Sequence, residues 1–112
     1  MKNIDEYQIE TRRTAKRLDK EEDFNFDVSI LVMGLCGEAG EVADYLKKVI
    51  GHGHTLDINK LNKELGDTFW YLVRIADMYG LKGSDILEEN IAKLKKRYPK
   101  GFSNEASKNR IE

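Results

Sequence analysis

The sequence contains a single cysteine and a single proline in 112 residues. Cys36 has no second cysteine to pair with, so an intrachain disulfide framework is excluded and a reducing, cytoplasmic setting is expected. The chain also lacks the run of about 20 apolar residues that a membrane span requires, and its first residues form no apolar signal segment. We therefore expect a soluble cytoplasmic protein that does not enter a membrane.

Neither sign of charge is in excess, because 19 basic residues face 20 acidic ones and the net charge is −1. This balance argues against a nucleic-acid-binding protein that works by bulk electrostatic attraction. The length suits one domain, residues 1–112, and not two. Because so short a chain buries a limited share of its surface, we expect association into homo-oligomers to add core.

The alternating pattern of a β-strand is also missing, as are repeats and low-complexity tracts. Apolar residues instead recur every three or four positions, which predicts amphipathic helices. Short connections between them favour an all-α fold, a four-helix bundle. The expected helices cover about residues 3–20, 28–50, 57–79 and 84–98. Asp27 and Asp57 are placed to cap the second and third helices, and Pro99 closes the fourth.

The stretch "GLCGEAGEVADYL", residues 34–46, combines three glycines with two glutamates inside the second predicted helix. Each interior glycine costs about 0.8–1.0 kcal/mol relative to alanine. At about 100° per residue, Glu38 lies within the apolar stripe and Glu41 lies beside it. A buried carboxylate is costly unless something pairs with it. Gly34, Gly37 and Gly40 either permit close helix packing or leave room for a ligand beside the carboxylates.

The third predicted helix repeats the spacing in "NKELGDTFWYLV". Lys60, Glu64 and Asp67 fall within a sector of about 60°. The main apolar face is expected to consist of Leu61, Leu65, Phe69, Leu72 and Ala76. Because most of the remaining circumference is apolar too, we expect a central helix, with Asp67 covered by its neighbours.

A short connection would make the second and third helices antiparallel neighbours, so that their four acidic side chains face one groove. Such charges repel unless cations neutralise them. Oxygen ligands favour Mg²⁺, with Mn²⁺ as a possible substitute. The alternative is that Glu38 is a structural acid paired with a lysine. A di-iron carboxylate bundle requires Glu-x-x-His pairs, which the sequence lacks.

The fourth predicted helix places Asn90, Lys93 and Arg97 along one face. Taken alone, this face reads as an ordinary solvated surface. Beside a metal–carboxylate groove, however, two cations and an amide donor would suit a polyphosphate.

These motifs together resemble the MazG-like branch of the all-α nucleoside triphosphate pyrophosphohydrolase superfamily, over about residues 28–104. Its ExxE and ExxD signatures read here as Glu38-x-x-Glu41 and Glu64-x-x-Asp67, and "NIAKLKKRYPKGF" is similar as well. The resemblance implies Mg²⁺-dependent hydrolysis of nucleoside triphosphates between the α- and β-phosphates, giving monophosphate and pyrophosphate. It implies that the four acids hold the metal and serve catalysis, one glutamate being the general base.

By the same resemblance, Lys60, Lys93 and Arg97 contact the phosphates, and helices pair across subunits of a dimer or tetramer. Two alternatives stay open: an enzyme like phosphoribosyl-ATP pyrophosphohydrolase, and a helical interaction module without turnover. The base preference is also open. Phe24, Phe26, Trp70 or Tyr71 could stack on a base or belong to the core.

Overall fold

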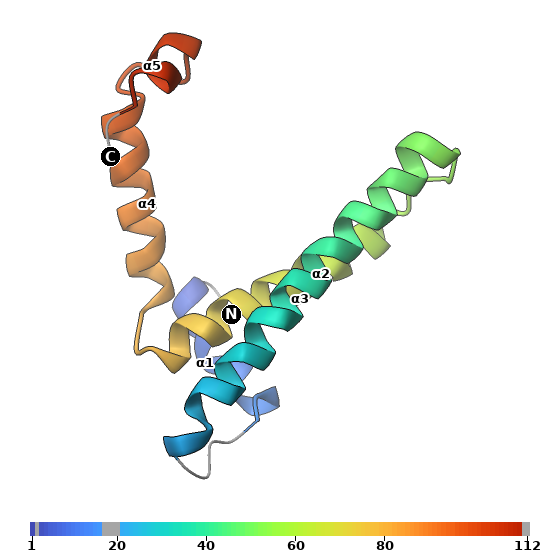
Figure 1. Ribbon diagram of the computed structural model, residues 1–112, viewed down its shortest axis with the longest axis vertical. Coiled ribbons are helices and arrows are strands. Elements are labelled where there is room, and N and C mark those ends of the chain that lie inside the picture. Colours follow the sequence, from blue (N-terminus) through green and yellow to red (C-terminus); the bar gives the residue numbers. More distant parts are fainter. Residues whose placement is uncertain (2, 17–20, 111–112) are drawn as a thin grey trace.

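The computed structural model describes residues 1, 3–16 and 21–110, and this part of the chain is helical and without a β-strand (Figure 1). Its helices are α1 (Ile4–Thr11), α2 (Phe24–His52), α3 (Ile58–Met78), α4 (Gly83–Arg97) and α5 (Asn104–Lys108), with 3₁₀ turns at Arg12–Thr14 and Glu21–Asp23. The predicted all-α class is confirmed. None of the helices in the described ranges is long and apolar enough to cross a membrane.

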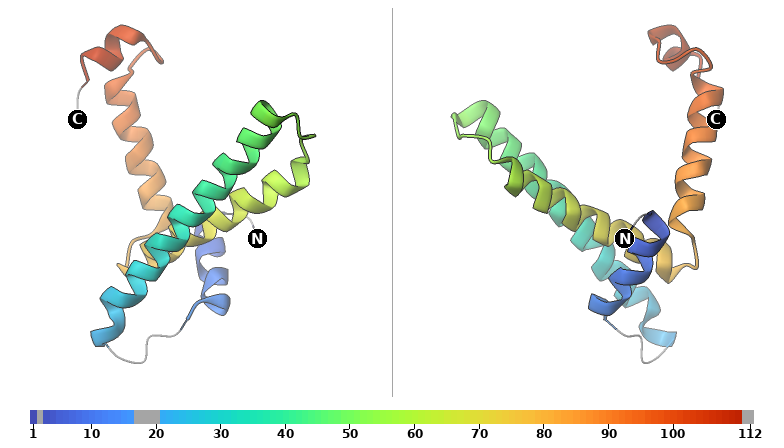
Figure 2. Two further views of the ribbon diagram at one scale, coloured as in Figure 1. Left: turned by 45° about the vertical axis from the view of Figure 1, so that its right-hand side comes forward. Right: turned by 180° about the vertical axis from the view of Figure 1, so that it is seen from behind.

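The long helices α2 and α3 form an antiparallel pair that is the largest packed unit of the molecule (Figures 1 and 2). Gly53 ends α2 with a positive φ of 71°, a conformation that glycine adopts without strain. As predicted, Asp57 caps α3, its side chain accepting hydrogen bonds from the backbone N–H groups of Asn59 and Lys60. The Tyr45 hydroxyl accepts a hydrogen bond from the Asp57 N–H at 2.7 Å, which ties α2 to the start of α3.

The short helix α1 packs against α3 and the start of α4, held by polar contacts. Buried Gln8 accepts a hydrogen bond from the Gly83 N–H at 2.8 Å and donates to the Leu81 carbonyl and to Asp77. Arg12 and Arg74 also bind the Asp77 carboxylate, at 2.8 and 3.0 Å. Asp77 thus joins α1 to α3.

After the turn at Gly80, α4 extends away from the α2–α3 pair, and α5 sits at its far end (Figures 1 and 2). The four predicted helices are therefore present, but within one chain α4 does not lie along the other three. Few apolar residues in the described part of the chain are buried: Tyr45, Val73 and Ala76. The expected apolar face of α3 is about half exposed at Leu65, Phe69 and Leu72, so a single chain does not cover it.

The helix boundaries differ from the prediction mainly before residue 28. The first helix was expected to reach residue 20, but α1 ends at Thr11 and Ala15 is already extended, while residues 17–20 lie outside the described part. The second helix begins at Phe24 instead of residue 28. Asp27 is consequently not its N-cap. Its carboxylate instead accepts a hydrogen bond from Lys16 at 3.0 Å, a partner that periodicity does not reveal.

Candidate functional site

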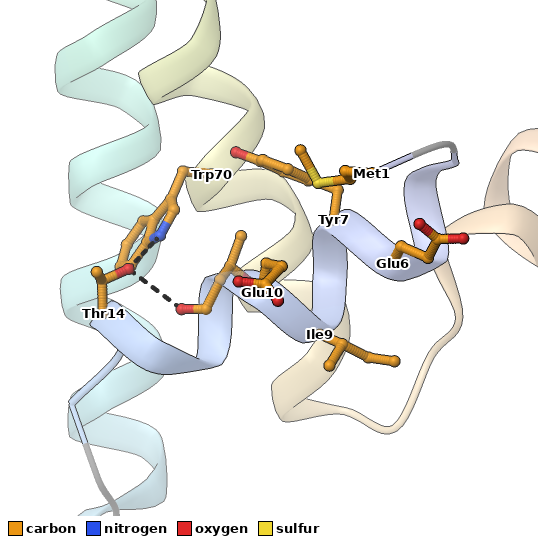
Figure 3. A pocket seen from close by; sticks show the side chains of 8 residues that line it. Met1, Glu6, Tyr7, Ile9, Glu10, Thr14 and Trp70 are labelled. Carbon is orange, nitrogen blue, oxygen red and sulfur yellow. Dashed lines mark hydrogen bonds between the residues drawn. The ribbon is translucent and has the colours of Figure 1, made fainter.

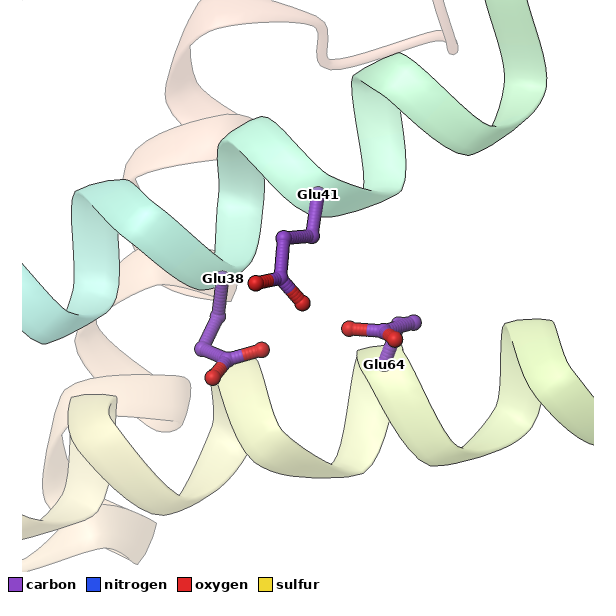
Figure 4. Close-up of side chains that lie close together, drawn as sticks. All are labelled: Glu38, Glu41 and Glu64. Atoms are coloured by element: carbon purple, nitrogen blue, oxygen red, sulfur yellow. The ribbon is translucent and has the colours of Figure 1, made fainter. Parts of the chain in front are cut away.

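Three glutamates from α2 and α3 converge in the groove between these helices (Figure 4). Glu38 and Glu41 point from consecutive turns of α2 toward Glu64 of α3, and one carboxylate oxygen of each lies within 4.8 Å of the others. The three-residue spacing in α2 makes its two glutamates surface neighbours, and the antiparallel pairing brings Glu64 opposite them. The structure therefore brings three of the four predicted acidic residues together.

Gathering these carboxylates in one cluster is electrostatically unfavourable. A hydrogen bond to the Glu64 carboxyl group raises the pKa of Glu41, and the negative charges of Glu64 and Asp67 raise it further. The positive charge of Lys60 acts in the opposite direction on the Glu41 pKa. In addition, Oε2 of Glu38 and Oε2 of Glu64 are buried without a hydrogen-bond partner among the described residues. The cluster therefore combines carboxylates that repel one another with carboxylate oxygens that no described donor satisfies.

A divalent cation fits this donor set. All donor atoms are carboxylate oxygens, the ligands that Mg²⁺ and Mn²⁺ prefer, and two of them are buried and unsatisfied. The structure favours this interpretation over a structural Glu38 paired with a lysine, because no lysine among the described residues forms an ion pair with Glu38. Glu38, Glu41 and Glu64 are the residues that could hold the metal.

Asp67 lies one turn beyond Glu64 and outside the three-glutamate cluster. It is exposed in the single chain, whereas we expected neighbouring helices to cover it. Its charge nevertheless acts on the cluster, since it raises the Glu41 pKa. Burial, and then the Asp67 charge, raise the pKa of Tyr7 on α1 as well, so the Asp67 charge acts on α1 and on the cluster.

Lys60 lies at the other end of the groove, near the start of α3. Its ammonium group sits 4.6 Å from the centre of the Tyr45 ring, a cation–π contact. Because Tyr45 is itself fixed by its bond to the Asp57 N–H, the lysine is held on the side of the groove from which its charge reaches Glu41.

The glycines of α2 divide into two kinds. A Cβ added at Gly34 would overlap the Tyr71 ring, so this glycine serves close helix packing. A Cβ at Gly37 or Gly40 would meet no atom within 4 Å. The open surface at these two positions is consistent with room for a ligand beside the carboxylates.

The predicted phosphate-binding residues of α4 are not near the glutamates within one chain, because α4 diverges from the α2–α3 pair (Figure 2). Asn90 and Lys93 are exposed and Arg97 is buried near the end of α4. A role at the carboxylate groove would require α4 of another copy of the chain.

Trp70 borders two cavities that the sequence did not predict. One, of about 610 Å³, opens between α1 and α3 and is bordered by Tyr7, Met1 and the indole ring (Figure 3). The indole N–H donates a hydrogen bond to Oγ1 of Thr14 at 2.9 Å. The other is a cavity of about 140 Å³ on the side of α2, bordered by Asp27 and Arg74. The sequence left Trp70 as a base-stacking or a core residue, and it could not reveal the partner Thr14, which lies 56 residues away in the chain.

Comparison with known proteins agrees with the geometry of the groove. The family model of the MazG nucleotide pyrophosphohydrolase domain matches residues 26–102, which include all four acidic residues. The chain is also 34% identical over 87 residues to the Gene 37 protein of Mycobacterium phage L5, covering 74% of this chain and 76% of that protein. No solved structure matches the chain significantly. The chain belongs to the MazG nucleotide pyrophosphohydrolase domain family.

Proposed function

We propose that the protein hydrolyses nucleoside triphosphates between the α- and β-phosphates, releasing monophosphate and pyrophosphate, with a divalent cation at Glu38, Glu41 and Glu64. The single observation that carries the proposal is the convergence of these carboxylates, two with buried and unsatisfied oxygens, in a chain of this family. Mg²⁺ held there would supply Lewis-acid stabilisation of the negative charge on the phosphates.

The side chains of the groove have separate roles in the proposed hydrolysis. A carboxylate of the cluster accepts the proton of the attacking water. Asp67, whose charge reaches Glu41, completes the acidic set. Lys60, held over the Tyr45 ring, is placed to contact a phosphate oxygen.

Asn90, Lys93 and Arg97 bind the departing pyrophosphate in this proposal, and they do so from another subunit. Two observations support that arrangement: α4 projects away from its own groove, and the apolar face of α3 is left half exposed. Association of two or four chains would cover that face and bring a second α4 to the groove.

The proposal is tested by incubating the protein with a panel of ribo- and deoxynucleoside triphosphates, with Mg²⁺ and with a chelator. We expect monophosphate and pyrophosphate to form directly, and only with metal. Formation of nucleoside diphosphate and phosphate would show that a different bond is cleaved. Absence of turnover with every nucleotide would favour the second candidate, an interaction module, or a more specialised nucleotide such as phosphoribosyl-ATP.

A further inference from the structure

The cavity of about 140 Å³ beside Trp70 has features of a ligand site. It lies among α2, α3 and the segment that follows α1. Ile30, Leu31 and Met78 give it apolar walls, and Trp70 adds an aromatic wall. Pockets that bind small molecules combine such walls with a few polar groups that fix the ligand's orientation.

Asp27 is the polar group that points to the ligand. Its side chain is about 10% exposed, and its Oδ1 accepts a hydrogen bond from Lys16. Its Oδ2 is buried and has no hydrogen-bond partner in the described part of the chain. A buried acceptor without a donor is unfavourable, so a ligand that offers an N–H group would be stabilised here.

The cavity lies at a suitable distance from the three-glutamate cluster. Asp27 precedes Glu38 by 11 residues, which places it about 16 Å away along α2 and within about 20° of the same face. The cavity wall is closer, since Leu31 lies about 10.5 Å along α2 from Glu38 and Trp70 lies about 9 Å along α3 from Glu64. One ribose and one α-phosphate separate a nucleobase from the bond that the proposed reaction cleaves, and this interval can accommodate them.

The size of the cavity favours a single ring. An apolar cavity of about 150 Å³ holds one benzene ring. We propose that this cavity binds the base of a pyrimidine nucleoside triphosphate, whose N–H donates to Oδ2 of Asp27 while the ring lies against Trp70. This inference rests on the proposed function, because it assigns the base of that substrate.

Trp70 provides a direct probe, since it is the one tryptophan of the chain and its ring borders the cavity. Its fluorescence should be followed while cytidine, uridine, adenosine and guanosine are added without metal. We expect the pyrimidine nucleosides to change the emission in a saturable way and the purine nucleosides to do so at least about tenfold more weakly. Nucleosides carry no phosphate, so this readout does not depend on hydrolysis.

The matching kinetic test uses Asp27→Asn. With the amide oxygen facing Lys16, the variant presents an N–H₂ donor in place of the Oδ2 acceptor. We expect kcat/KM for pyrimidine nucleoside triphosphates to fall roughly 10- to 100-fold, as for one hydrogen bond to a charged group, with a smaller change for purines. Asp44→Asn is the control, because exposed Asp44 pairs with Lys47 and Lys48 on the same helix, away from the cavity.

The outcomes separate this inference from the proposed function. If nucleosides leave the Trp70 emission unchanged while purine and pyrimidine triphosphates are hydrolysed equally well, the base site is refuted and the hydrolase stands. If pyrimidine nucleosides bind but no triphosphate is hydrolysed, the base site stands and the hydrolase is refuted. Equal binding of purine nucleosides would also overturn the pyrimidine assignment.

Discussion

At the scale of single residues, the groove between α2 and α3 gathers negative charge that the described side chains do not balance. Glu38, Glu41 and Glu64 bring oxygens within 4.8 Å, while Lys60 is the basic residue whose charge is seen to act on Glu41. Such an arrangement is unfavourable for folding alone and becomes favourable when a cation binds. Fold stability alone therefore does not explain why these carboxylates gather in the groove, and the proposed metal binding would.

Replacing Glu41 by glutamine tests this explanation. Glu41→Gln keeps the shape of the side chain and removes a charge, so we expect kcat/KM with Mg²⁺ to fall by about 10²-fold or more. Because the side chain is exposed, the thermal midpoint should stay the same or rise. Asp67→Asn should behave likewise. Steady-state pyrophosphate release checks both, with Glu105→Gln on α5 as the control; full activity in either variant would refute the assignment.

The glycines of α2 give a matched pair for stability. Gly34→Ala would push a methyl group into the Tyr71 ring and should lower the free energy of unfolding by about 1–3 kcal/mol. Gly37→Ala meets open space and should raise the free energy of unfolding by up to about 1 kcal/mol through helix propensity. Urea titrations of both variants decide the matter. Equal destabilisation by the two substitutions would contradict the packing role of Gly34.

Much of this residue-level site could be predicted from sequence. The three-residue spacings place two acidic residues on one side of each helix. The helix cap at Asp57 could be predicted because aspartate is a preferred N-cap residue. The role of Gly34 could not be decided, because it depends on which residue of α3 lies opposite. Asp27 was misassigned as a cap for the same reason: its partner, Lys16, is set by how the chain folds back before α2.

At the scale of elements, α1 is a short helix held by polar contacts. Gln8 and Arg12 of this segment bind Asp77 of α3, and Gln8 also binds Gly83 at the start of α4. The Arg12 guanidinium, with hydrogen bonds from Gln8 and Arg74, lowers the pKa of Asp77 from 3.8 to about 2. Docking of α1 onto α3 consequently depends in part on the charge of Asp77.

That dependence predicts how stability responds to acid. Because the Asp77 pKa is lower in the folded chain, its contribution is complete above about pH 4 and is lost as the pH falls toward 2. Asp77→Asn should lower the free energy of unfolding by about 1–2 kcal/mol at neutral pH, after allowance for solvent screening. The free energy of unfolding of this variant should also fall less steeply as the pH is lowered below about 4.

Circular dichroism during urea unfolding at several pH values measures this effect. Asp85→Asn, an exposed aspartate of α4, serves as the control and should leave the pH profile unchanged. If the free energy of unfolding falls as steeply with acid in Asp77→Asn as in the unaltered chain, another carboxylate anchors α1.

The arrangement of elements was less predictable than their existence. Helical periodicity located α2, α3 and α4 to within a few residues, because each repeats its apolar positions over several turns. Periodicity carries no signal for the direction of α4, which depends on the turn at Gly80 and on the contacts of Gln8. The short helix α5 was missed because its five residues, NEASK, are mostly polar and too few to show an apolar repeat.

At the scale of the whole molecule, the described helices α3 and α4 leave large apolar side chains exposed. Phe69, Leu72 and Leu65 on α3 are about half exposed, and Ile91 and Leu87 on α4 are similar. The proposed association of subunits would cover these faces and place α4 of one chain over the groove of another.

Complementation tests whether the site is shared between subunits. Glu41→Gln and Lys93→Ala should each be nearly inactive alone. If α4 acts across subunits in a dimer, mixing the two unfolded chains and refolding should restore about a quarter of the activity, because half of the dimers are mixed and each holds one intact site. No recovery in refolded mixtures that contain mixed dimers would place the two residues in the same subunit's site.

The most direct test of the central claim is a titration of the protein with Mn²⁺, followed by electron paramagnetic resonance of the free ion. We expect saturable binding by the unaltered chain, loss of at least about 10-fold in affinity in Glu41→Gln, and unchanged binding in Glu105→Gln. Equal Mn²⁺ binding by the unaltered chain and Glu41→Gln would show that the three-glutamate cluster is not the metal site.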